Sequence, residues 1–169
     1  KGDKVAICAR NQVNWGVCFL ASLTYGAVPV PILHEFKPGN IHYLVNHSEA
    51  KVLFIDDVLW ENLSENEMPE LYVIVQMNTL KYLYSRDADL KLVRDNLPDT
   101  FASEFPGGFT PDDVDYYEDK PDDLALINYT SGTSGFSKGV MIPYRAMWSN
   151  LNFAWEEMGS QLMPGENFV

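Results

Sequence analysis

The chain has 169 residues, of which 46% are hydrophobic and 21% charged, and its formal net charge at pH 7 is −12. This size and composition indicate a globular protein with a core of its own. The acidic balance argues against a nucleic-acid partner and against attraction to anionic membranes, since both require basic side chains. No apolar run is long enough to predict a transmembrane segment.

The two cysteines, Cys8 and Cys18, each lie in an apolar run. We expect both to be small buried hydrophobic side chains, and their spacing is not that of a metal site. With no signal peptide in the sequence, we expect a reduced, cytoplasmic setting, and peripheral membrane association stays open. The chain starts at Lys1 and stops at Val169 inside an apparent strand, which predicts a piece of a longer protein.

Strands and helices alternate through the first half of the chain. Apolar runs predict strands at 4–9, 28–33, 51–55 and 71–75, and Pro29 and Pro31 place the second of these at a sheet edge. Helical spacing predicts helices at 14–25, capped by Asn14 and ended by Gly26, at 38–48, and from Asp56 or Asp57 to about 63. This alternation predicts an α/β fold with a mostly parallel sheet that helices cover on both faces.

Residues 85–123 differ in character from the first half. Twelve acidic and four basic side chains lie there and account for eight of the twelve net negative charges. We interpret the stretch as a solvated connecting segment with a short helix near 87–96. The acidic pairs 112–113 and 122–123 are candidate ligands of a hard cation, but they lack the spacing of a calcium loop, and we predict no metal site.

A loop rich in glycine and hydroxyl side chains follows a predicted strand at 124–129, which we expect to enter the sheet. Between Thr130 and Gly139 lie three glycines, several Ser and Thr residues and Lys138, and a strand at 140–142 comes next. Glycine lets the backbone aim N–H groups into an anion-binding nest, and Lys138 adds a positive charge. Such a loop suits a polyphosphate, although a simple turn between strands is the alternative.

Two other nucleotide-binding loops are excluded by the residues present. A Walker A loop needs glycine before its lysine and Ser or Thr after it, whereas Ser137 and Gly139 flank Lys138. No Gly-x-Gly-x-x-Gly follows the first strand, so the dinucleotide fingerprint is absent. No nucleophile elbow accompanies His34, His42 and His47, and we expect all three to be structural or surface residues.

A helix is predicted at 144–158. Its stripe of Met147, Leu151, Ala154 and Trp155 is typical of a face packed in a core. A turn is predicted at 164–167.

The loop resembles the phosphate-loop signature of the adenylate-forming superfamily, Tyr-Thr-Ser-Gly-Thr-Thr-Gly-x-Pro-Lys-Gly-Val. The chain departs from it at Ser134, usually Thr, and at Ser137, usually Pro, whose loss removes a fixed φ. The segments starting at Gly2, Gly26 and His47 look like those of bacterial long-chain acyl-CoA synthetases. The resemblance implies one partial N-terminal AMP-binding domain: βαβ units in 1–84, the acidic connection in 85–123, and strand, phosphate-loop hairpin and helix in 124–169.

The resemblance implies that ATP activates a carboxylic acid, a long-chain fatty acid by preference, to an acyl-adenylate that coenzyme A converts to a thioester, with Mg²⁺ as metal cofactor. The implied phosphate-binding residues are Thr130, Ser131, Gly132, Thr133, Ser134, Gly135 and Lys138. The family's adenine, ribose and magnesium motifs and its adenylation lysine are not found here. We therefore expect no catalytic or metal-binding residue in the 169 residues, and an isolated chain that is inactive.

The resemblance also implies that the rest of such a domain covers an apolar surface of this chain. We therefore expect the chain alone to self-associate. Two alternatives stay open. One is a non-catalytic α/β interaction module in which the glycine loop is only a connection. The other is an adenylating enzyme that acts on amino or aryl acids.

Overall fold

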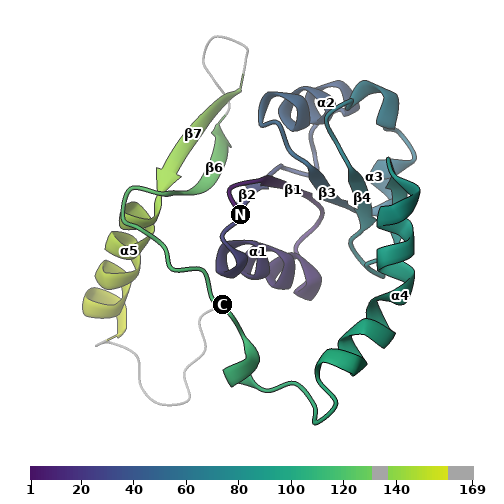
Figure 1. Cartoon of the computed structure of the whole chain (residues 1–169). Helices are drawn as coiled ribbons and strands as arrows, with labels where there is room; N and C mark the ends of the chain where they lie inside the picture. Colours follow the sequence, from purple (N-terminus) through teal and green to yellow (C-terminus); the bar gives the residue numbers. More distant parts are fainter. Residues whose placement is uncertain (131–136, 160–169) are drawn as a thin grey trace.

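The computed structural model describes residues 1–130 and 137–159 and has a five-stranded sheet at its centre (Figure 1). The strands occur in the order β2-β1-β3-β4-β5. The first four are parallel and β5 runs antiparallel to β4. Their bounds are β1 Lys4–Cys8, β2 Val28–Pro31, β3 Val52–Ile55, β4 Val73–Gln76 and β5 Tyr82–Ser85.

The predicted α/β fold with a mostly parallel sheet is confirmed, but β5 was not predicted. β5 has the sequence Tyr-Leu-Tyr-Ser, and all four residues are half-buried. No run of aliphatic side chains marks this strand in the sequence.

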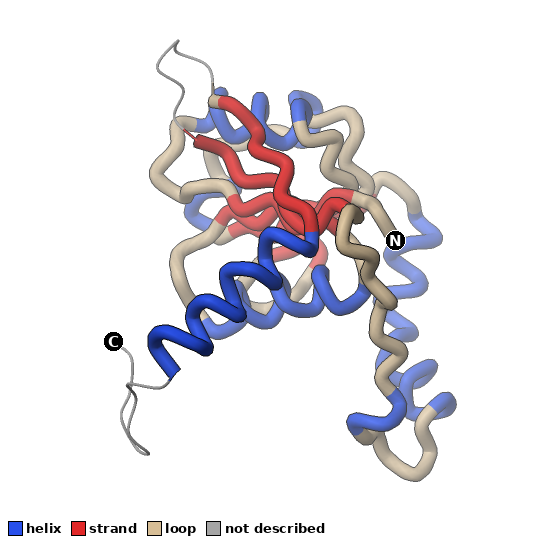
Figure 2. Tube along the Cα trace, turned by 90° about the vertical axis from the view of Figure 1, so that its left-hand side faces the viewer, coloured by secondary structure: helices blue, strands red, loops and turns tan. Residues whose placement is uncertain are grey.

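Helices cover both faces of the sheet (Figure 2). They are α1 (Val13–Tyr25), α2 (Pro38–His47) and α3 (Asp57–Trp60), with a 3₁₀ turn η1 (Glu65–Glu67). Successive side chains of a strand point to opposite faces. Along β1, Cys8 packs in the core cluster that contains Leu44 of α2, whereas Ile7 packs in the cluster that contains Cys18 of α1. Both cysteines are buried, as predicted.

The boundary signals around α1 and β2 are confirmed. Gly26 ends α1 in the left-handed region with φ 80°, which glycine adopts without strain. β2, which carries Pro29 and Pro31, lies at the end of the hydrogen-bonded strand order. A proline has no N–H to give to a neighbouring strand, and an edge position tolerates it.

The predicted helix caps are wrong, because no side chain makes a capping hydrogen bond at the start of α1 or α3. Gln12 is the N-cap residue of α1, and the Asn14 amide donates instead to the carbonyl of Met77 at 2.8 Å, after β4. Asp56 precedes α3, but its carboxylate makes no cap hydrogen bond and accepts from the loop after β1. Both polar side chains connect neighbouring loops at the carboxyl ends of the strands, a use that local sequence does not reveal.

The acidic segment contains a longer helix than predicted. α4 spans Ala88–Glu104 and continues through Pro98, with the Asp87 side chain accepting from the Asp89 N–H at its start. A 3₁₀ turn η2 (Pro111–Asp113) follows, and the chain then returns to the end of α1. There the Tyr117 N–H donates to the carbonyl of Thr24 at 2.8 Å.

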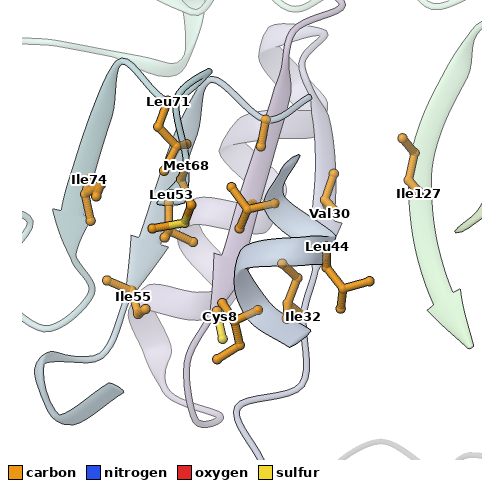
Figure 3. Close-up of a cluster of buried hydrophobic side chains, with 14 of the residues drawn as sticks. Cys8, Val30, Ile32, Leu44, Leu53, Ile55, Met68, Leu71, Ile74 and Ile127 are labelled. Atoms are coloured by element: carbon orange, nitrogen blue, oxygen red, sulfur yellow. The ribbon is translucent and has the colours of Figure 1, made fainter. Parts of the chain in front are cut away.

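The strand before the glycine-rich loop belongs to a hairpin of its own. β6 (Leu124–Thr130) pairs antiparallel with β7 (Lys138–Pro143) in a separate two-stranded sheet. The expectation that residues 124–129 enter the large sheet is therefore wrong: β6 lies alongside β2 without joining the ladder (Figure 1). Side chains make this junction, with Ile127 of β6 facing the side of the core that holds Val30 and Leu44 (Figure 3).

After the hairpin, α5 (Tyr144–Phe153) continues into a π-helical turn, η3 (Ala154–Met158). The prediction that its apolar stripe packs in a core is wrong, because Leu151 is 59% exposed and Trp155 81% exposed. Helical spacing shows that a face is apolar but not what covers it. The turn predicted at 164–167 lies outside the described residues, and among the helices described none has the length and apolar character needed to cross a membrane.

Candidate functional site

The antiparallel register of the hairpin places two predicted phosphate-binding residues side by side. Thr130 is the last residue of β6 and Lys138 the first of β7, and they are partners across the two strands. Side chains of such partners lie on the same face with their Cβ atoms about 5 Å apart. Both side chains are exposed. The remaining predicted residues, Ser131, Gly132, Thr133, Ser134 and Gly135, lie outside the described residues.

Alternation along β6 separates its core side from its outer side. Ala125, Ile127 and Tyr129 are buried, whereas Asn128 and Thr130 are exposed. A strand with one face on the core shows this period of two. The hydroxyl of Thr130 therefore lies on the face of β6 opposite the buried Tyr129 ring.

The next pair along the ladder is Tyr129 and Gly139. A Cβ atom on Gly139 would lie 3.1 Å from Cε1 of Tyr129 and 3.2 Å from Cγ2 of Ile127, closer than packed side chains normally approach. Gly139 therefore makes room for the Tyr129 ring against β7. In the sequence this glycine is the last residue of the glycine-rich stretch, and no local pattern indicates its packing role.

A histidine of the large sheet's helices holds the hydroxyl of Tyr129. Nδ1 of His47, the last residue of α2, lies 2.7 Å from the Tyr129 hydroxyl oxygen, and the two rings meet edge to face at 5.7 Å. Burial, with a smaller contribution from Tyr43, raises the pKa of Tyr129 to about 12, and the hydroxyl stays protonated at neutral pH. His47 thus has a structural contact, as predicted for the histidines, although Tyr129 had not been identified as its partner.

A cavity of about 310 Å³ opens beside the loop end of the hairpin. The ends of β1 and β2, the first residues of α1 and the end of β6 contribute to its wall. Aromatic and aliphatic side chains dominate the lining, with a few polar groups, a composition typical of small-molecule sites. The lining residues are Ala9, Asn11, Trp15, Pro31, Ile32, Leu33, His34, Phe36, Asn128 and Tyr129.

Asp56 fixes the loop that forms part of this wall. Its buried carboxylate accepts from the Arg10 backbone N–H and from the Gln12 side-chain amide, both at 3.0 Å. Asn11 lies between these two donors and lines the cavity. Burial, and to a lesser degree the Asp56 charge, raises the pKa of the nearby Cys8 thiol to about 12, so this cysteine is not a nucleophile.

The acidic pairs of the connecting segment serve local structure. Asp113 accepts from the backbone and hydroxyl of Thr110, Asp123 accepts from the Tyr117 hydroxyl at 2.7 Å, and Asp122 pairs with Arg145. Within residues 1–130 and 137–159, no group of three or more His, Cys, Asp or Glu side chains is placed to hold a metal ion.

The chain thus has a mostly parallel α/β sheet with a two-stranded hairpin set against its edge strand β2, and the glycine-rich segment connects the two strands of that hairpin. The sequence model of the AMP-binding enzyme family matches residues 1–168. The chain belongs to that family.

Acyl-CoA ligases are among the relatives that match. The chain is 27% identical to a medium-chain fatty-acid–CoA ligase of Escherichia coli K12 over 93% of its own length, and 28% identical to a long-chain-fatty-acid–CoA ligase of E. coli O6:H1 over all of it. A long-chain-fatty-acid–CoA ligase from Archaeoglobus fulgidus has the same fold over 94% of the chain, with 24% identity and a TM-score of 0.65. The chain spans only 28% to 32% of the lengths of these proteins.

Proposed function

We propose that the protein containing this chain activates a carboxylic acid with ATP and then transfers the acyl group to coenzyme A. A carboxylate oxygen attacks the α-phosphorus, the bond to the bridging oxygen of the β-phosphate breaks, and pyrophosphate leaves. The sulfur of coenzyme A then attacks the acyl carbonyl and AMP departs. Membership of the AMP-binding enzyme family and the acyl-CoA ligases among the relatives support this reaction, in which residues 1–169 form part of a larger N-terminal domain.

The hairpin's role in this proposal is to bind the β- and γ-phosphates. The observation that carries it is the register, which pairs Thr130 with Lys138 across the two strands, next to the glycine-rich segment that connects them. Among the residues that the structure describes, Lys138 makes no ion pair. Negative charge accumulates on the departing pyrophosphate, and donors aimed there beforehand lower the barrier. The loop residues Ser131, Gly132, Thr133, Ser134 and Gly135 complete the proposed binding set.

We further propose that the cavity of about 310 Å³ holds an organic group of one of the reactants. It adjoins Tyr129, one residue before Thr130, and its walls are largely apolar. A fatty acid is the preferred acid, because several relatives are named for fatty acids. The acid is established by measuring activity with a panel of fatty, aryl and amino acids.

The experiment that tests the reaction is acid-dependent exchange of labelled pyrophosphate into ATP by the full-length protein. We expect Lys138→Ala to slow exchange by roughly 100-fold or more, the cost of removing one such donor. Lys91→Ala is the matched control, because Lys91 lies on α4, away from the hairpin (Figure 1). An unchanged rate in Lys138→Ala would favour the non-catalytic module.

A further inference from the structure

The hairpin that bears the glycine-rich loop has no backbone pairing with the large sheet. Within the described residues, the backbone ladder of β6 and β7 joins only these two strands, and the five strands of the large sheet form a separate ladder. Backbone hydrogen bonds between paired strands fix their relative position directly, and among the described residues the hairpin has no such pairing with β2. The direction in which Thr130 and Lys138 point therefore depends on the side chains that join the hairpin to its neighbours.

A polar contact crosses this junction one residue from the proposed phosphate site. His47 ends α2, whose Ile41, Leu44 and Val45 are almost fully buried in the core of the large sheet. Its Nδ1 lies 2.7 Å from the hydroxyl oxygen of Tyr129. The imidazole is thus carried by a well-anchored helix.

The Tyr129 ring transmits this contact to both strands of the hairpin. Its backbone belongs to β6, and on β7 the ring lies against Gly139, where a Cβ atom would meet it at 3.1 Å. Gly139 directly follows Lys138, and Tyr129 directly precedes Thr130. The ring thus belongs to the residue before Thr130 and packs against the residue after Lys138.

We propose that His47 is a positioning residue for the phosphate loop, acting through Tyr129. This inference rests on the proposed function, and nothing in the sequence pattern of the loop assigns His47 to it. A tyrosine hydroxyl both donates and accepts, so this contact holds with either imidazole tautomer and with the protonated ring. Loss of the contact lets the loop end of the hairpin shift, which weakens binding of the triphosphate more than it alters the chemistry of bound reactants.

The test is the kinetics of pyrophosphate exchange in the full-length protein. We expect His47→Leu and Tyr129→Phe each to raise KM for ATP about fivefold, the effect of one net hydrogen bond, with kcat changed less than KM. The double variant should be no worse than either single variant, because both remove the same contact. His47→Asn should restore KM, since its side-chain amide places a polar atom where Nδ1 lies.

His42→Leu is the matched control. His42 lies on the same helix, but its Nε2 accepts from the Ser64 N–H at 3.2 Å, away from the hairpin. KM for ATP should stay at the wild-type value. An unchanged KM in His47→Leu, or effects of His47→Leu and Tyr129→Phe that multiply in the double variant, would overturn the inference.

A second measurement separates this inference from the proposed function. If the wild-type protein exchanges no pyrophosphate with any acid, the proposed function fails. Hydrogen exchange then decides the role of His47: we expect the ladder amides of β6 and β7 to exchange faster in His47→Leu while those of β1 and β3 keep their protection. Unchanged protection across the hairpin would show that His47 does not hold it.

Discussion

The large sheet and the β6–β7 hairpin are stabilised in different ways. The sheet's strands are paired with one another and covered by α1 on one face and α2 on the other, and buried side chains of these strands and helices form its core. The hairpin buries one face of β6, while β7 is exposed or half-buried along its whole length. The first region has a core of its own, and the second takes its position from contacts with the first.

Two tyrosine hydroxyls mark the ends of that attachment. Near the loop, Tyr129 binds His47 of α2, and at the other end of β7, the Tyr144 hydroxyl donates to the carbonyl of Leu23 on α1 at 3.1 Å. Each contact joins the hairpin region to a helix of the large sheet. The proposed phosphate-binding residues Thr130 and Lys138 therefore lie on the region that takes its position from the other, where small changes in packing can redirect them without unfolding the sheet.

The largest effect should come from the core of the sheet. Leu53 on β3 is fully buried, and we expect Leu53→Ala to lower the free energy of unfolding by about 4 kcal/mol because it leaves a cavity. Urea unfolding measures this change. Leu92→Ala, at a residue 60% exposed on α4, should change it by less than about 0.5 kcal/mol. Similar losses in both variants would contradict the assignment of the core.

Gly26→Ala should cost about 3 kcal/mol, since it combines a left-handed backbone with a clash. Gly26 has φ 80°, and a Cβ there would lie 2.5 Å from Cγ of Tyr117. Adding Tyr117→Ala should remove the clash and leave the backbone strain. Gly39→Ala is the control, since it has neither feature. Equal unfolding midpoints for Gly26→Ala and wild type would refute this account of the junction.

Gly139→Ala tests the hairpin alone. Its Cβ would crowd Tyr129 and Ile127, and we expect a loss of about 1–2 kcal/mol, confined to the hairpin. Hydrogen exchange should show faster exchange in β6 and β7 and unchanged protection in β1. Gly107→Ala has open space at its Cβ and should behave like wild type. Equal loosening of β1 would mean that the two regions unfold as one unit.

The apolar face that α1 and α5 leave exposed should make the isolated chain self-associate. Val13 is 82% and Trp155 81% exposed, and a groove of about 370 Å³ lies between the two helices. We expect light scattering to give a mass that rises with concentration, and Leu20→Lys with Leu151→Lys to suppress the rise. A constant monomer mass at every concentration would count against this prediction.

The smallest effect concerns pH and the junction before β6. Hydrogen bonds from the Tyr117 hydroxyl and the Lys120 backbone N–H hold the pKa of Asp123 below its ordinary value. A carboxyl with a lowered folded pKa stabilises the fold above its unfolded pKa, and this contribution is lost as pH falls through the folded pKa. We therefore expect Asp123→Asn to flatten the decline of the urea midpoint below about pH 4. Asp99→Asn on α4 serves as control and should keep the wild-type decline. Identical declines in all three proteins would show that Asp123 does not contribute to the loss of stability at low pH.

Local patterns in the sequence determined the parallel sheet, the ends of α1 and α2, the edge position of β2 and the family resemblance of the loop. These features depend on apolar periodicity, on glycine and proline geometry and on a contiguous motif, all of which act between near neighbours in the chain. Only the tertiary structure decided that β6 forms a separate hairpin, that Asp56 and Asn14 connect loops instead of capping helices, and that His47 meets Tyr129 across 82 residues of sequence. Such pairings depend on how distant elements pack, because the energy of a polar side chain is set by the partner it reaches in space.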